Sequence, residues 1–140
     1  MRDSLLGKKP NDWDITTSAK PEEVKAIFRR TIDTGIQHGT VTVLVNREIL
    51  DDGSGVPASH TDYAFEVTTY RVDGVYTDHR RPESVCFTAS LEEDLKRRDF
   101  TINAMAYNPE QGVIDIFGGQ DDLEQGIIRC VGEASERFDE

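Results

Sequence analysis

The sequence is poor in cysteine, has no long hydrophobic run and contains little positive charge. Its 140 residues include only Cys86 and Cys130, with no Cys-x-x-Cys pair, which excludes a disulfide scaffold and predicts free thiols in a reducing cytoplasm. No apolar run exceeds five residues, so we expect neither a membrane span nor a signal peptide. The three histidines have no partner at ligand spacing, which argues against zinc.

The charge balance is acidic, with 16 Lys and Arg against 27 Asp and Glu and a net charge of −11. Such a surface repels the phosphate backbone of nucleic acids. The acids concentrate near the end, because residues 109–140 contain nine acids against two arginines. Any phosphate binding must therefore be local, and the basic residues do occur in short clusters: Lys8-Lys9, Arg29-Arg30, His79-Arg80-Arg81 and Lys96-Arg97-Arg98.

Hydrophobic residues make up 36% and charged residues 31%, which is typical of a folded globular domain. Apolar spacing and capping signals predict an α/β (mixed α+β) domain, a mixed sheet backed by helices. A loop is expected at 51–59 and a turn at 73–74. The expected helices span 2–6, 21 to about 31, 90–98 with a restart over 102–107, and a turn at 121–124; the expected strands span 12–16, 40–45, 63–71, 113–117 and 127–131.

Two aspartates at i and i+2 stand on the first predicted strand. Side chains two apart on a strand point to the same face, so Asp12 and Asp14 can meet one divalent cation while Trp13 and Ile15 pack behind them. Paired carboxylates that hold Mg²⁺ suit phosphoryl chemistry. In so acidic a chain, however, an isolated Asp-x-Asp is commonly a solvated turn.

Three further residues are candidates for the same chemistry. Glu66 lies on a strand that can pair beside the Asp strand, although its spacing equally fits an edge acid facing water. Arg98 follows a predicted helix and can hold a triphosphate, or it can form a salt bridge to Glu93 or Asp94. Arg2, in the opening turn, either approaches phosphate or is solvated.

Together these segments resemble the bacterial-type tRNA nucleotidyltransferase (CCA-adding enzyme)/poly(A) polymerase family. The first signature of that family resembles residues 1–7 and 10–17, and further matches lie at 38–41, 65–71 and 80–83. The resemblance is sharpest at residues 90–106, SLEEDLKRRDFTINAMA, which match the second signature almost word for word. It closes with Asp115, Gly118-Gly119, Asp122-Leu123, Gly126, Ile128-Arg129, Val131-Gly132-Glu133 and Arg137-Phe138.

The resemblance implies a head domain of the nucleotidyltransferase (polymerase-β-like) fold. It implies two Mg²⁺ ions on Asp12 and Asp14, with Glu66 as the third acid and with Arg2 and Arg98 on the bound nucleotide. The expected reaction adds C and A from CTP and ATP to the 3′ end of tRNA. Open alternatives are a poly(A) polymerase, a sibling that adds only CC or only A, and an inactive RNA-binding fragment.

The sequence departs from the family pattern at both ends. Family members carry two glycines just before the first signature, and they continue past the last matched residues into a motif that reads the base. We therefore expect residues 1–132 to be a head domain without its glycine motif and 133–140 to begin the next domain, the neck. The stretch 73–82 resembles the family's flexible loop, which is linked to switching between C and A addition.

Overall fold

The computed structural model describes residues 1–46, 62–73 and 85–133. The chain divides into two compact units, which are considered separately below: a sheet unit, Trp13–Ala89, and a terminal unit, Met1–Asp12 with Ser90–Glu140. The expected loop at 51–59, the family loop over 74–82 and the neck residues 134–140 lie outside the described residues. In the described part of the chain, no helix is long and apolar enough to cross a membrane.

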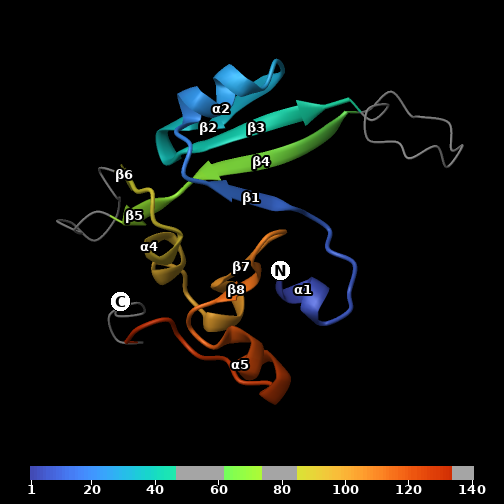
Figure 1. Ribbon diagram of the computed structural model, residues 1–140, viewed down its shortest axis with the longest axis vertical. Coiled ribbons are helices and arrows are strands. Elements are labelled where there is room, and N and C mark those ends of the chain that lie inside the picture. Colours follow the sequence, from blue (N-terminus) through green and yellow to red (C-terminus); the bar gives the residue numbers. More distant parts are fainter. Residues whose placement is uncertain (47–61, 74–84, 134–140) are drawn as a thin grey trace, which may run out of the picture. The chain divides into compact units, whose positions relative to one another are not determined.

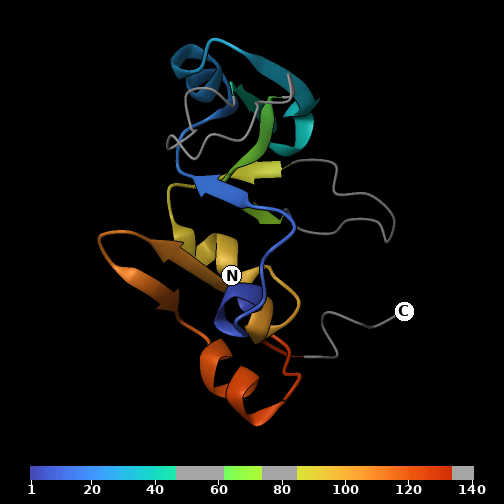
Figure 2. The ribbon, with the colours of Figure 1, turned by 90° about the vertical axis from the view of Figure 1, so that its right-hand side faces the viewer.

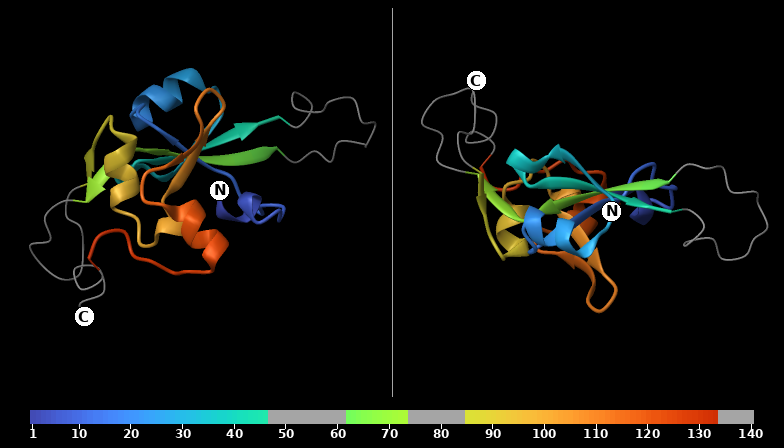
Figure 3. Two further views of the ribbon diagram at one scale, coloured as in Figure 1. Left: turned by 60° about the horizontal axis from the view of Figure 1, so that its bottom comes forward. Right: turned by 90° about the horizontal axis from the view of Figure 1, so that it is seen from above.

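The sheet unit is built on one mixed sheet of four strands (Figure 1). The outer strand β1 runs parallel to its neighbour β4, while β3 is antiparallel to both β4 and β2. Helix α2 (Pro21–Ile27), which joins β1 to β2, lies over one face of this sheet (Figure 3). The strand order is β1 (Asp14–Thr17), β4 (Tyr63–Thr69), β3 (Thr40–Val45) and β2 (Thr31–Gly35).

The core of the sheet unit follows from alternation along the strands. Val41, Val43 and Val67 are buried together with Val24 of α2, so they form the face that the helix covers. Successive strand residues point to opposite faces. The residues between these valines therefore form a second face, and the sheet has one apolar side and one polar side.

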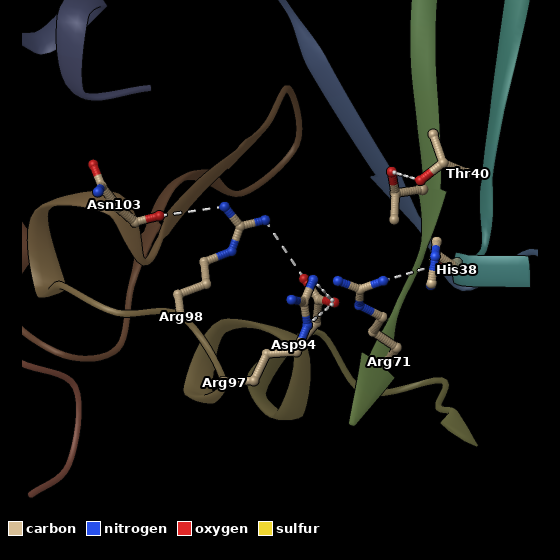
Figure 4. A network of polar contacts seen from close by, with 8 residues as sticks. His38, Thr40, Arg71, Asp94, Arg97, Arg98 and Asn103 are labelled. Carbon is tan, nitrogen blue, oxygen red and sulfur yellow. Dashed lines mark hydrogen bonds and ion pairs between the residues drawn. The ribbon is translucent and has the colours of Figure 1, made fainter. Parts of the chain in front are cut away.

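A second strand pair, β5 (Arg71–Asp73) with β6 (Val85–Phe87), completes the sheet unit. It is held against the short 3₁₀ helix η1 (Ile36–His38), where Arg71 Nη1 donates to the His38 carbonyl at 2.9 Å (Figure 4). Gly39, which follows η1, has a φ of +85°, and a Cβ there would lie 2.6 Å from the Phe87 ring. The positive φ favours glycine, and any other residue there would also have to displace the Phe87 ring.

The described residues of the terminal unit form three short α-helices, a 3₁₀ turn and a hairpin, which Figure 2 shows from the side. As predicted, Ser90 caps the helix that follows it, because its hydroxyl accepts from the Glu93 N–H at 3.4 Å. The Asp115 carboxylate stabilises the start of the last helix, α5, because it accepts from the N–H groups of Gly119 and Gln120. The elements are α1 (Arg2–Leu5), α4 (Leu91–Lys96), η2 (Thr101–Asn103), β7 (Met105–Asn108), β8 (Gly112–Asp115) and α5 (Gly119–Gln125).

The predicted helix from 21 to about 31 was too long. Helix α2 ends at Ile27, since Phe28 is extended, and residues 31–35 form β2, a strand that the prediction missed. The helical spacing of Ile27 and Phe28 suggested a buried stripe, but Ile27 is 70% exposed. The β-branched Thr31 and Ile32 instead pair with β3, so long-range strand pairing prevails over local periodicity.

Three other predictions in the terminal unit were wrong. The proposed helical restart over 102–107 is a 3₁₀ turn followed by β7, which pairs with β8 along its whole length. Residues 127–131 form no strand, and only one bridge joins Phe100 to Cys130. Helix α4 also ends before Arg98, at Lys96. Both cysteines are free thiols; we expected both to be buried or half-buried, and Cys130 is half-buried whereas Cys86 is exposed.

Candidate functional site

Two candidate acids lie side by side in the sheet unit. Asp14 is the first residue of β1, and the parallel register places it opposite Glu66 of β4. Residues at paired positions on neighbouring strands point to the same face, so both carboxylates lie on the polar side, away from α2. Both residues are exposed. The prediction that the Glu66 strand pairs beside the Asp strand is thus confirmed.

Asp12 does not share this strand. β1 begins at Asp14, so Asp12 and Asp14 are not two residues of one strand and need not point to the same face. Asp12 is exposed and belongs to the terminal unit. Trp13 and Ile15 also differ from the prediction that they pack behind the aspartates. They are 63% and 45% exposed: Trp13 precedes β1, and Ile15 lies on this outermost strand of the sheet.

Threonines lie on the same face as the two acids, which also carries Leu44 and Ala64. Thr40 and Thr68 share a hydrogen bond across β3 and β4 at 3.0 Å, and Thr34 pairs with Thr42 at 2.9 Å. Thr42 stands opposite Glu66 in the register. The cross-strand hydroxyl pairs each stabilise the sheet by about 0.2–1 kcal/mol and keep this face polar around the two acids.

The acid pair has the chemistry of a hard-cation site. Magnesium prefers carboxylate oxygens and is commonly bound through one or two of them, with water and substrate phosphate completing its coordination. The in-register pair of Asp14 and Glu66 fits that requirement. Within residues 1–46, 62–73 and 85–133, no group of three or more His, Cys, Asp or Glu side chains is close enough to hold a metal.

The candidate arginines lie in the terminal unit, around a buried aspartate. Asp94 is 1% exposed and accepts from Arg97 Nε and Nη2 at 3.1 Å, while Arg98 Nη2 lies 3.6 Å from its other oxygen (Figure 4). The salt bridge from Arg98 to Asp94, which spacing alone allowed, is therefore present. Two guanidinium groups share one carboxylate, which leaves a local positive charge in an acidic chain.

Asn103 links the two predicted arginines. Its side-chain oxygen accepts from Arg2 Nη1 at 2.9 Å, and its main-chain carbonyl accepts from Arg98 Nη1 at 3.4 Å. Figure 4 shows the Arg98 guanidinium between Asn103 and Asp94. Arg2 also donates to Asp3 at 3.1 Å. We call Arg2, Arg98 and Asn103 the arginine cluster.

Sequence reasoning missed Asn103 as a site residue, although it lies within the matched segment SLEEDLKRRDFTINAMA. Its signal was a polar amide inside the otherwise apolar run Ile102 to Met105. In the 3₁₀ turn, its side-chain oxygen accepts from Arg2, its side-chain nitrogen donates to Asp99 at 3.4 Å, and its main-chain carbonyl accepts from Arg98. The structure thus joins Arg2 to Arg98 through a residue that spacing did not single out.

The chain matches known proteins along nearly its whole length. Residues 1–129 match the family described as "Poly A polymerase head domain". CCA-adding enzymes of Leuconostoc mesenteroides and Geobacillus thermodenitrificans are 53% and 54% identical over all 140 residues, which cover 31% of each. This chain therefore spans about a third of the length of these relatives.

Solved structures agree with the family match. The Bacillus stearothermophilus CCA-adding enzyme in complex with CTP has a TM-score of 0.77 at 48% identity, over 99% of this chain and 29% of that one. A Thermotoga maritima CCA-adding enzyme complexed with tRNA has a TM-score of 0.59 at 27% identity, over 99% of this chain and 28% of that one. The predicted nucleotidyltransferase fold is confirmed, and the chain belongs to the poly A polymerase head domain family.

Proposed function

We propose that this chain is the catalytic head of a template-independent RNA nucleotidyltransferase that adds C and A from CTP and ATP to the 3′ end of tRNA. The observation that carries this proposal is the in-register pair of Asp14 and Glu66 on parallel strands. The choice of CCA addition rests on the similarity to CCA-adding enzymes over the full length of the chain. The proposed localisation is cytoplasmic.

The carboxylates of Asp14 and Glu66, together with Asp12, would hold two Mg²⁺ ions. When bound there, magnesium would offset phosphate charge and favour the ionised form of an attacking hydroxyl. The exposed position of Asp14 and Glu66 on a polar sheet face suits this role, because a nucleotide can reach them.

The arginine cluster would bind the triphosphate. A guanidinium binds phosphate through two parallel N–H donors, and Arg98 is already oriented by Asp94 on one side and Asn103 on the other. In the reaction, the RNA 3′ oxygen forms a bond to the α-phosphorus while the bond to the β-phosphate bridging oxygen breaks. Pyrophosphate leaves, and positive charge around it stabilises the transition state.

Poly(A) synthesis is the second candidate, because the family description carries that name. Both activities use the same chemistry and differ in the choice of nucleotide and in when addition stops. An inactive RNA-binding fragment is the alternative from a different class. The nucleotides added to the RNA distinguish CCA addition, poly(A) synthesis and an inactive fragment from one another.

The test uses a hybrid enzyme in which this chain replaces the matching third of the Leuconostoc mesenteroides relative. The hybrid receives a tRNA that lacks its 3′ CCA, with labelled CTP and ATP, singly and together, in Mg²⁺ or in EDTA. Two C residues, then one A and a stop, in Mg²⁺ only, are expected. A long A run would indicate the second candidate, and no incorporation beside an active unmodified relative would contradict catalysis by this chain.

A further inference from the structure

A charge network in the terminal unit, between the buried Asp122 and the exposed side chain of Arg129, is separate from the residues assigned so far. Asp122 of α5 is 4% exposed, and both of its carboxylate oxygens accept from Arg129 at 3.0–3.1 Å. The Thr101 hydroxyl donates to the same carboxylate at 2.7 Å. Hydrogen bonds from Arg129 and then from Thr101 lower the pKa of Asp122, so the carboxylate is charged at neutral pH.

Thr101 is fixed at three of its atoms by the segment that contains α5. Its hydroxyl bonds to Asp122, and its N–H donates to the Arg129 carbonyl at 2.9 Å. Its own carbonyl lies so close to Gly119 that a Cβ added there would be 2.3 Å from the oxygen. The sequence resemblance included these three residues of the segment without giving them a role.

The fixed residue begins the turn that carries the arginine cluster. Thr101 is the first residue of η2 and Asn103 is the last, and the Ala104 N–H closes the turn onto the Thr101 carbonyl at 3.0 Å. Asn103 then receives Arg2 and Arg98. In the described part of the chain, the side chains of Asp122 and Arg129 bond only to each other and to Thr101.

We propose that Asp122 and Arg129 are positioning residues for nucleotide binding: they hold Thr101, and through it the η2 turn, so that Asn103 joins Arg2 to Arg98 in the orientation that receives a triphosphate. This proposal rests on the proposed function, because it assigns nucleotide binding to the arginine cluster. It gives α5 a role in nucleotide binding, although Asp122 of α5 bonds to neither Arg2 nor Arg98.

The charge on Asp122 supports a role in orienting Thr101 more than a contribution to the overall stability of the fold. Asp122 is buried, but the Arg129 side chain is 60% exposed, and an ion pair with an exposed partner contributes little to overall stability. Charged hydrogen bonds are directional, and they hold a turn in one orientation. Small displacements of substrate-binding groups have large effects on catalysis. Holding the η2 turn in one orientation would therefore serve nucleotide binding.

The experiment compares Thr101→Val with Thr101→Ser in the hybrid enzyme. Valine keeps the shape of the side chain and removes the hydroxyl, while serine keeps the hydroxyl. We expect Thr101→Val to raise KM for CTP about tenfold with KM for tRNA nearly unchanged, and Thr101→Ser to restore KM for CTP. Asp122→Asn should act in the same direction, whereas Asp121→Asn, the same change at the exposed neighbour, should not.

A folded Thr101→Val variant with an unchanged KM for CTP would overturn the proposal, as would a loss of kcat or melting temperature alone. If the unsubstituted hybrid adds no CMP, the proposed function fails, and hydrogen exchange on the 140-residue chain then decides the structural step. Faster exchange at the Asn103 and Ala104 amides in Thr101→Val supports a role for Thr101 in holding η2. Unchanged exchange at both amides overturns it.

Discussion

The two units of the chain position their functional groups in different ways. In the sheet unit, Asp14 and Glu66 are aligned by backbone register, and the pairing of β1 with β4 suffices to place them. In the terminal unit, Arg98 is aligned by polar contacts of its own guanidinium, to the Asp94 carboxylate on one side and to the main-chain carbonyl of Asn103 on the other. The first arrangement tolerates side-chain changes without loss of fold, whereas the second depends on a network in which each member orients the next.

This contrast gives the two units different responses to mutation. Removing an exposed acid from the sheet takes away chemistry and leaves the valine core intact. Removing a buried acid from the arginine network takes away stability as well, because unpaired charges remain inside the protein. The predictions below test that difference, beginning with the largest expected effect.

Asp14→Ala should lower nucleotide incorporation by the hybrid enzyme about a thousandfold, because a proposed metal ligand is lost from the site of phosphoryl transfer. The melting temperature should change little, since Asp14 is exposed and outside the core. Glu22→Ala, a change at another exposed acid, is the control. An Asp14→Ala variant with full activity would remove Asp14 from the proposed site.

Asp94→Asn should destabilise the chain by about 3 kcal/mol, measured by urea unfolding, because the guanidinium groups of Arg97 and Arg98 lose their shared buried carboxylate. Asp99→Asn, at an exposed acid of the same segment, should cost less. If the two variants were equally stable, the arginine network would not depend on its buried acid, and the contrast between the units would fail.

Arg98→Ala should weaken CTP binding by the hybrid enzyme about thirtyfold, since a charged hydrogen-bond donor to phosphate is worth about 2 kcal/mol. Binding of tRNA should change less. Arg97→Ala is the matched control, because Arg97 also bonds to Asp94 but Arg98 alone of the two reaches Asn103. Equal losses of CTP and tRNA affinity on Arg98→Ala would contradict a role for Arg98 in phosphate binding.

The smallest effect concerns pH. The pKa of Asp122 is lowered below its ordinary value of 3.8 by Arg129 and Thr101, so its charged form stabilises the fold above that pH. This stabilisation should disappear as the pH falls below 3.8 through the native value. The melting-temperature difference between the unsubstituted chain and Asp122→Asn should therefore shrink below pH 4, while Asp121→Asn should show no such trend.

Local patterns predicted those features that depend on neighbours in sequence. The alternation at 40–45 gave β3, Ser90 and Glu93 gave the start of α4, and β-branched residues after Glu66 placed that acid in a strand. Strand β2 was missed because its pairing with β3 overrides the helical spacing that precedes it.

Long-range contacts were harder to predict. Asn103 receives Arg2 from 101 residues away, and Thr101 bonds to Asp122 across 21 residues. The spacing of residues in the sequence does not predict such partners, because they depend on how the η2 turn and α5 pack in the folded chain. The restart over 102–107 was misread for the same reason, because its apolar residues pair with β8 instead of continuing a helix.

The central claim is that the register of β1 and β4 builds a metal-binding pair of acids for nucleotidyl transfer. Mg²⁺-dependent incorporation of labelled CTP onto tRNA lacking CCA tests it most directly, with Glu66→Gln compared with Glu22→Gln in the hybrid enzyme. We predict that Glu66→Gln loses most of this activity while it keeps its melting temperature, and that Glu22→Gln retains both. Incorporation at the unsubstituted rate by a folded Glu66→Gln variant would contradict the account.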